Sequence, residues 1–240
     1  MKYLLSYLFI FISALFVLPI NQKMYKVTYK IRRVEDKSRD TYSNNYKSNK
    51  NLAEVSDHVA VVASDFTYTL YFNSQESSYT MDDYTPDETI NDWYYSLALF
   101  VGGKGIYYQN KPKAMAMQQK FDNMSDDFIR IKDTLYKPWS ITNEAKTIQQ
   151  HKVVKATYND FEVWFAPDIP VPFGPKGLGG LPGLILEASD GHFDVYVDKI
   201  DLDKSNYVIK MPTKGKIMSA VEKQVRDNRL MFHSTKKYTH

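Results

Sequence analysis

The stretch from Trp164 to Ala188 constrains the fold of this chain more than any other part of its sequence. It holds five of the ten prolines and five of the ten glycines. Proline fixes φ and lacks a backbone N–H, while glycine adopts positive φ and lets two backbones approach closely. Strand-like apolar runs lead into this stretch at 161–165 and out of it at 184–186. The pattern predicts a stiff excursion between two β-strands, here called the Pro/Gly loop (167–183).

Two interpretations of the Pro/Gly loop remain open. Gly and Pro punctuate turns, which favours a packed structural corner, and long ordered loops often carry function, which favours a binding site. A phosphate cradle is disfavoured, because Pro182 occupies the third glycine position of G-x-G-x-x-G and a strand follows where a helix N-terminus is needed. The candidate binding or structural residues are Trp164, Phe173, Gly174, Pro175, Leu178, Gly180, Leu181, Pro182, Gly183, Leu184 and Ile185.

A structural corner places specific requirements on these residues. Three glycines are expected to adopt positive φ or to lie against another backbone, namely Gly179, Gly180 and Gly183. Four neighbours are expected to be buried, namely Leu181, Pro182, Leu184 and Ile185. Phe173 and Leu178, by contrast, are expected to lie nearer the surface, where truncation is tolerated.

Residues 180–185 also carry a resemblance. They read Gly-Leu-Pro-Gly-Leu-Ile, and together with its flanks this segment resembles the GLPGLI family of exported bacterial proteins. The flanking residues that match the family pattern are Trp139–Thr142, Lys146, Ile148, Lys155-Ala156, Trp164, Pro167, Ile169-Pro170, Gly174-Pro175, Leu186-Glu187, Lys214–Lys216 and Glu222. The resemblance covers most of the chain after its signal-like start, and it implies an exported protein of no established activity.

The absence of cysteine limits both the resemblance and the chemistry. Many members of that family carry a cysteine just before the Lys-Ala pair, whereas this chain has Lys152-Val153-Val154 there and no cysteine anywhere. Disulfides, thiolate metal sites and a thiol nucleophile are therefore excluded. Any thiol role that the resemblance implies does not apply to this chain.

Residues 1–20 are predicted to be a signal peptide or an N-terminal anchor. Lys2 precedes an apolar run over 3–18, which is short for a membrane span and typical of an export signal. No small-x-small cleavage pattern follows, so both alternatives stay open, and no further membrane span is expected. Residues 21–240 are predicted to form a single β-rich domain, exported to the periplasm or associated with the envelope.

Alternating residues and turn signals predict a β-rich α+β fold. We expect a mostly antiparallel curved sheet, with the half-barrel of periplasmic lipoprotein carriers as one possible form. The segment 24–34 places Tyr25, Val27, Tyr29 and Ile31 on one face. Hairpins are expected between 66–73 and 77–81, between 152–158 and 161–165, and between 184–189 and 192–200. Single strands are expected at 105–109, 114–121, 128–136 and, at an edge of the sheet, 207–211.

Two or three helices are predicted. A helical period favours 51–64. Thr85 and Glu88 form a capping box, with Pro86 at the first helical position, and predict a helix that ends at Gly102-Gly103. Its apolar stripe, expected to cover the sheet, is Ile90, Trp93, Tyr94, Leu97 and Ala98. Ser219 with Glu222 predicts a last helix whose apolar side is Val221, Val225 and Phe232.

The sequence contains no recognisable motif for catalysis or metal binding. The five histidines lack the H-x-x-x-H spacing, and Ser56, Asp57 and His58 are adjacent, so their side chains cannot form a triad. The oxygen-rich run from Asp198 to Asn206 lacks EF-hand spacing and predicts a solvated turn. No catalytic residue, cofactor or metal is therefore expected. The net charge of +3 is close to balanced and does not favour binding to nucleic acid.

Three functions remain open on the sequence. The leading hypothesis is a non-enzymatic binding or accessory protein of the cell envelope, whose partner is an envelope protein or an apolar ligand. In that case Trp164, Phe173, Leu178 and Leu181 are expected to line or gate a cleft. The alternatives are an envelope hydrolase, and a structural partner of an outer-membrane complex that uses the Pro/Gly loop as its contact surface.

Overall fold

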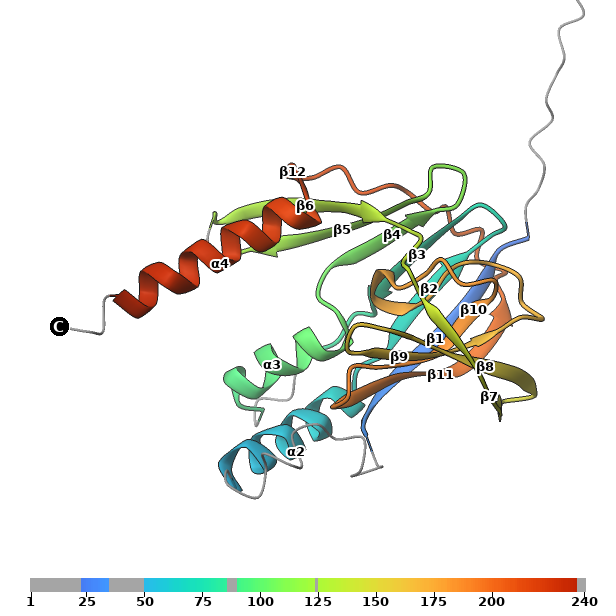
Figure 1. Cartoon of the computed structure of the whole chain (residues 1–240), viewed down its shortest axis with the longest axis horizontal. Coiled ribbons are helices and arrows are strands. Elements are labelled where there is room, and N and C mark those ends of the chain that lie inside the picture. Colours follow the sequence, from blue (N-terminus) through green and yellow to red (C-terminus); the bar gives the residue numbers. More distant parts are fainter. Residues whose placement is uncertain (1–22, 35–49, 86–89, 124, 237–240) are drawn as a thin grey trace, which may run out of the picture.

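The computed structural model describes residues 23–34, 50–85, 90–123 and 125–236 (Figure 1), so the predicted signal or anchor at 1–20 lies outside them. Within these ranges, no helix is long and apolar enough to cross a bilayer. In chain order the elements are β1 (Tyr25–Arg33), α2 (Lys50–Ser64), β2 (Tyr68–Phe72), β3 (Glu76–Met81), α3 (Asp92–Gly102), β4 (Ile106–Asn110), β5 (Met115–Asp122), β6 (Asp127–Thr134), β7 (Ser140–Ile148), β8 (His151–Tyr158), β9 (Phe161–Ala166), η1 (Pro175–Gly177), β10 (Leu184–Ser189), β11 (Phe193–Leu202), β12 (Lys216–Ser219) and α4 (Ala220–Lys236).

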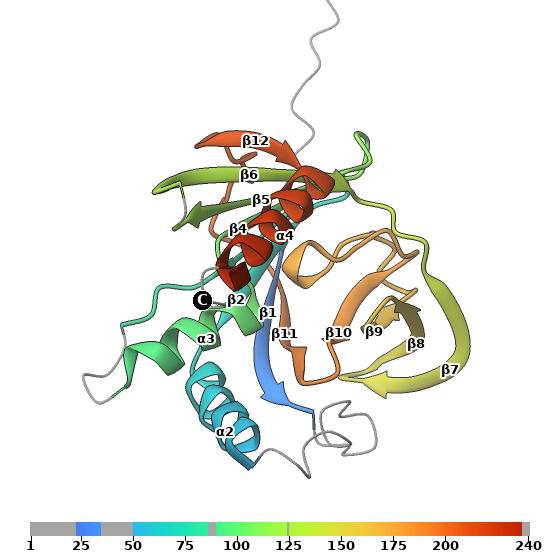
Figure 2. The same cartoon turned by 60° about the vertical axis from the view of Figure 1, so that its left-hand side comes forward.

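The described strands form one open, curled sheet. Their order is β12-β6-β5-β4-β3-β2-β1-β11-β10-β9-β8-β7. Neighbouring strands pair antiparallel, except that β12 runs parallel to β6. β2, β1 and β11 lie in the middle, with one arm that leads through β4, β5 and β6 to β12 and another that leads through β10, β9 and β8 to β7 (Figure 2). The predicted β-rich fold, with a mostly antiparallel curved sheet and helices, is confirmed.

β1 joins the two arms of the sheet. It pairs with β2 on one side and with β11 on the other. Val27, Tyr29 and Ile31 are buried in the core, as the alternation predicts. The alternating pattern of β1 therefore identified the strand that joins the two arms.

The helices α2 and α3 pack against each other and lie together beside β1 (Figure 1). α2 agrees with its predicted range. α3 begins at Asp92, where the side chain of Asn91 caps it by accepting a hydrogen bond from the Trp93 N–H at 2.9 Å. The predicted first turn, with Pro86 and Glu88, lies outside the described residues. Trp93 is exposed while Ala98 is buried, so the apolar stripe is only partly covered.

The strand predictions differ from the structure at β7, at β12 and at 207–211. β7 was not predicted, because most of its residues are polar or exposed and its pattern shows no alternation. The segment 207–211, predicted as an edge strand, is not a strand. Instead the ring of Tyr207 stacks on Tyr71 with centroids 3.8 Å apart, and Ile209 is buried against Tyr108 and the methionines of β5. This segment covers one face of the sheet, and β12 forms the edge.

Three buried tyrosines make the stability of the folded state depend on pH. The hydroxyl of Tyr29 donates to the carbonyl of Ile185 at 2.7 Å, and that of Tyr79 donates to the carbonyl of Gly102 at 2.8 Å. The ring of Tyr68 stacks on Tyr79 with centroids 5.5 Å apart. Burial raises the pKa of all three hydroxyls well above its ordinary value. The folded state therefore keeps protons that the unfolded state releases at about pH 10.

We expect the free energy of unfolding to fall as the pH rises above about 10. Below that pH these hydroxyls are protonated in both states and add no pH dependence. Above it only the unfolded state ionises, which favours unfolding. Urea titrations between about pH 8 and about pH 11 measure this decline. The decline should be shallower in Tyr29→Phe and unchanged in Tyr136→Phe, whose ring is exposed. A Tyr29→Phe profile parallel to that of the wild type would contradict the prediction.

Candidate functional site

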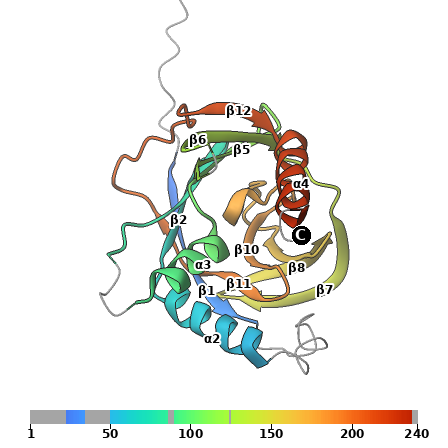
Figure 3. The same cartoon turned by 90° about the vertical axis from the view of Figure 1, so that its left-hand side faces the viewer.

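The Pro/Gly loop joins β9 to β10 and lies inside the curl of the sheet (Figure 3). Its backbone is tied together internally, since the Gly180 N–H donates to the Pro172 carbonyl at 3.0 Å and the Ile185 N–H donates to the Phe173 carbonyl at 3.0 Å. The single turn of η1 begins at Pro175, which is buried. The excursion predicted from the prolines and glycines is therefore present, and it is directed inward.

A buried glutamine and a tryptophan hold the loop between the two arms. Gln109 of β4 donates through Nε2 to the Leu178 carbonyl at 2.8 Å and accepts through Oε1 from the Gly174 N–H at 3.2 Å. Trp139, just before β7, donates through Nε1 to the Gly179 carbonyl at 2.8 Å. β4 and β7 belong to opposite arms, so the loop braces one arm against the other.

Apolar side chains of the loop fill the space between the arms. Phe173 is fully buried, and Leu178 and Leu181 pack in a cluster with Phe165 and Ile185. The expectation that Phe173 and Leu178 lie near the surface is wrong, because the sheet curls around the loop and turns both inward. Burial of the motif's apolar residues is confirmed for Leu181, Leu184 and Ile185.

Pro182 is exposed, so its predicted burial is wrong. Its two neighbours occupy the inward positions of this turn, and both of them are buried. Pro182 therefore shapes the turn from outside without filling the core.

The glycines of the motif allow unusually close backbone contacts, as predicted. Gly180 has a φ of +91°, and a Cβ built on it would lie 2.7 Å from the Cα of Tyr136. A Cβ on Gly183 would lie 2.2 Å from the carbonyl oxygen of Ala166, and one on Gly179 would lie 2.6 Å from a carbonyl oxygen of the loop itself. Real side chains do not tolerate such distances, so these positions require glycine.

A pocket of about 120 Å³ lies beside η1, between the loop and the β4–β5–β6 arm. Its polar lining is already engaged within the chain. Gln118 donates to the hydroxyl of Tyr107 at 2.8 Å, and the ammonium of Lys176 donates to a carbonyl in the last turn of α3 at 2.8 Å. Asp133 pairs with a neighbouring lysine. Burial lowers the pKa of Lys176, but its hydrogen bond gives that side chain a structural role in tying the loop to α3.

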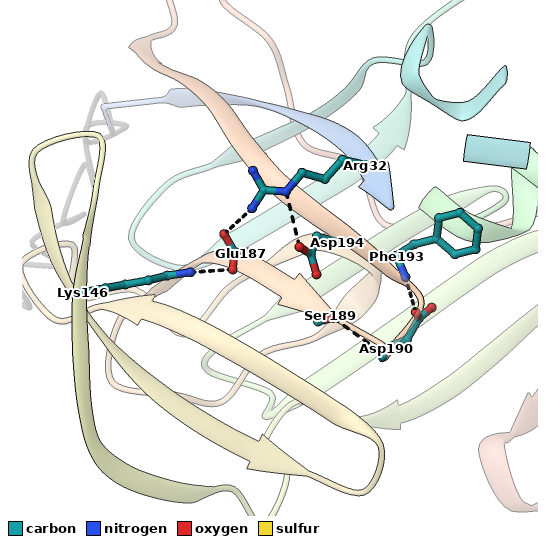
Figure 4. A network of polar contacts seen from close by, with 8 residues as sticks. Arg32, Lys146, Glu187, Ser189, Asp190, Phe193 and Asp194 are labelled. Atoms are coloured by element: carbon teal, nitrogen blue, oxygen red, sulfur yellow. Dashed lines mark hydrogen bonds and ion pairs between the residues drawn. The ribbon is translucent and has the colours of Figure 1, made fainter. Parts of the chain in front are cut away.

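A network of charged side chains surrounds Glu187, just after the motif (Figure 4). Its buried carboxylate accepts from Lys146 Nζ at 2.7 Å and from Arg32 Nη2 at 3.1 Å. Arg32 also donates through Nε to the buried carboxylate of Asp194 at 3.4 Å. These four residues come from β10, β7, β1 and β11 respectively. The network therefore ties the β10–β11 hairpin to β1 and β7, which are distant from it in sequence.

Aromatic rings support the two cations of this network. The ammonium of Lys146 lies 4.4 Å from the centroid of the Trp164 ring, and the guanidinium of Arg32 lies 4.6 Å from that of Tyr196. Such contacts contribute about 0.5–1 kcal/mol each at partly exposed sites. The cations are therefore held in fixed positions at the surface.

The sequence did not predict this network, although it singled out three of the residues involved. Lys146, Trp164 and Glu187 are among the residues on which the family resemblance rests. Arg32 and Asp194 were missed. They face each other across the β1–β11 pairing, and no local pattern indicates that two segments so far apart become neighbours.

No group of three or more His, Cys, Asp or Glu side chains within the described ranges is arranged to hold a metal ion. In the oxygen-rich run, the carboxylate of Asp203 accepts from the backbone N–H and the hydroxyl of Ser205, each at 3.0 Å. These bonds are those of a solvated turn, as the sequence predicts.

Comparison with known proteins gives a match to a family model and a structural similarity to solved structures. A family model described as a protein of unknown function (Porph_ging) matches residues 158–187, from the end of β8 through the Pro/Gly loop to Glu187. No curated protein matches. Two solved structures of PNGF-II, in space groups P21 and C2, are similar, each with a TM-score of 0.49 and 16% identity. They cover 85% and 84% of this chain, which spans only 33% and 32% of theirs.

Proposed function

We propose that the protein is a non-enzymatic binding or accessory protein of the bacterial cell envelope that binds another macromolecule on its outer surface. The observation that carries this proposal is the filled interior of the curled sheet. Phe173, Leu178 and Leu181, which were candidates to line a cleft, pack the loop between the two arms instead. A chain whose interior is occupied by its own loop presents its outer surface to partners.

The dimensions of the interior support surface recognition over transport of an apolar ligand. Pockets for small molecules typically occupy about 300–1,000 Å³, whereas the pocket beside η1 measures about 120 Å³ and its polar groups are paired. Admitting a ligand between the arms requires that Phe173 leave the core and that the hydrogen bonds of Gln109 break. That rearrangement costs several kcal/mol, at about 2 kcal/mol or more for the ring and about 1 kcal/mol for each hydrogen bond.

The proposed location of the protein in the cell envelope rests on its sequence. Residues 1–20 have the pattern of an export signal or anchor, and 180–185 with their flanks resemble the GLPGLI proteins. We propose membership of that group. The Pro/Gly loop then serves as an internal brace that fixes the two arms, and through them the shape of the outer surface. A preorganised surface loses less entropy when it binds a partner.

Cross-linking in native envelope tests the proposal. Detection with an antibody should place the chain in a discrete complex heavier than the free protein, while an exported protein of similar size that forms no complex serves as the control. Native mass spectrometry of the purified protein should give the mass of the polypeptide alone. A stoichiometric bound lipid, together with migration as a free monomer, would replace this proposal with that of an apolar carrier.

A further inference from the structure

The last helix, α4, lies against the sheet through its charged side. The guanidinium of Arg226 donates two hydrogen bonds to the carboxylate of Asp122 at the end of β5, at 3.0 and 2.9 Å. Asp122 is almost fully buried under this pair, and the side chain of Lys223 is only 17% exposed. A bidentate ion pair therefore holds the helix in place, where apolar packing is the usual means.

The apolar side of α4 faces the solvent. Val221 and Val225 lie four residues apart and so share one side of the helix, and they are 69% and 45% exposed. Two of the three residues predicted for the apolar side therefore face the solvent, because the helix is docked through its charged side instead. Phe232 has no described side chain. In β12, directly before the helix, Ile217 is 49% exposed and adds a third exposed apolar side chain to this end of the chain.

β12 adds a second feature to this surface. It is the last strand of the sheet and pairs only with β6 among the described strands. Its outer edge therefore presents backbone N–H and C=O groups, which a strand of another protein can pair with. The exposed valines and the strand edge are adjacent in the chain, and together they are here called the β12–α4 surface.

The charge of this end of the chain indicates what it binds. Residues 214–240 contain seven Lys or Arg and two Asp or Glu, a net charge of +5, whereas the whole chain carries only +3. Lys223 and Arg226 are paired on the docked side of α4, and the described cations beside the exposed side are Lys214 and Lys216, both of them exposed. We propose that the β12–α4 surface docks a second protein whose matching surface is apolar at its centre and acidic at its rim. This inference rests on the proposed function and assigns the surface that performs it.

Two other occupants fit less well. A second copy of this chain would bring two strongly basic surfaces together, which is unfavourable. An anionic membrane matches the charge, but lipid chains cannot satisfy the backbone groups at the β12 edge.

Site-specific photo-cross-linking in the living cell tests this inference. A benzoylphenylalanine at position 221 should give a discrete adduct, and the same probe at Val61 should give none. Val61 is the matched control, because it is a helical valine with 70% exposure on the distant α2. The protein in the adduct, identified by mass spectrometry and purified, should bind this chain with an affinity that falls as the salt concentration rises.

Two substitutions define the contact. Val221→Asp should weaken that purified complex at least about tenfold, as loss of a central contact does, while Val61→Asp should leave it unchanged. An aspartate in the first turn of α4 is compatible with the helix, so the fold is retained. Lys214→Glu with Lys216→Glu should weaken the complex similarly, whereas the exposed pair Lys111→Glu with Lys113→Glu should not.

Each alternative has its own outcome. An adduct at twice the mass of the chain indicates a second copy, and sedimentation of the purified protein with vesicles of phosphatidylglycerol indicates a membrane. Either result overturns the docking of an acidic protein. A native complex that gives no adduct from position 221 overturns this surface but leaves the proposed function standing. Absence of any complex overturns both.

Discussion

Replacing Phe173 by alanine is expected to lower the free energy of unfolding by about 3–5 kcal/mol, the usual cost of removing a buried phenylalanine. The ring is fully buried in the main core cluster. Its backbone carbonyl also accepts from Ile185, so the residue is fixed at both its ring and its main chain. The neighbouring strands cannot close over the space left behind, because the loop is held to Gln109 and Trp139. The cavity is expected to persist and to contribute to the loss.

Phe100→Ala provides the control, since the same side chain is 59% exposed on α3. Its loss should change the stability by no more than about 0.5 kcal/mol. Denaturant titrations of both variants and the wild type measure the difference in the free energy of unfolding, provided that the m-values are unchanged. If Phe173→Ala unfolds like the wild type, the loop does not belong to the core and the interior is free to open, which would also weaken the proposed function.

Features set by neighbouring residues could be predicted from the sequence. The capping box at the start of α4 forms as expected, since the Ser219 N–H donates to the Glu222 carboxylate at 2.6 Å and the Glu222 N–H donates to the Ser219 hydroxyl at 3.1 Å. The Asp190-Gly191 hairpin forms as well, with the Asp190 carboxylate accepting from the Phe193 N–H at 2.9 Å. Both depend on contacts within four residues, where side-chain chemistry alone decides the conformation.

Features set by the curl of the sheet could not be predicted in the same way. Whether the Pro/Gly loop points inward or outward depends on how β4 and the segment before β7 close around it, and this decides the burial of Phe173. The orientation of α4 likewise depends on Asp122, which is about a hundred residues away. An amphipathic pattern shows that two sides differ, but it does not show which side meets the protein.

The features of the candidate site also differ in whether they could be predicted from the sequence. The need for glycine at its tight positions was predicted, because glycines clustered with prolines indicate turns and close backbone contacts, but the backbones that they contact, those of Tyr136 and Ala166, could not be named. The partners of Glu187 were not predicted, since Lys146 was known only as a residue that matches a family pattern, while Arg32 and Asp194 reach the network through the pairing of β1 with β11. Long-range pairing is therefore the step at which prediction of this site from the sequence fails.

The glycines of the motif give the second large effect. Gly183→Ala places a Cβ 2.2 Å from the backbone oxygen of Ala166, and Gly180→Ala combines a positive φ of +91° with a Cβ 2.7 Å from the Cα of Tyr136. In both cases the obstacle is backbone, which cannot move without breaking a strand or the brace. Each substitution is expected to cost on the order of 1–3 kcal/mol, with Gly183→Ala at the upper end.

Pro182→Ala is the control for the glycine series, because Pro182 lies between the two glycines and is exposed. It should cost less than about 1 kcal/mol, chiefly through the greater freedom of the unfolded chain. Thermal melts of the three variants, read beside the cross-linking assay of the native complex, separate two roles for the motif. If the glycine variants are destabilised but still join the complex when folded, the motif is a structural brace, as we infer. If they melt like the wild type and the complex is lost, the motif itself is the recognition surface, and the assignment of docking to β12 and α4 is wrong.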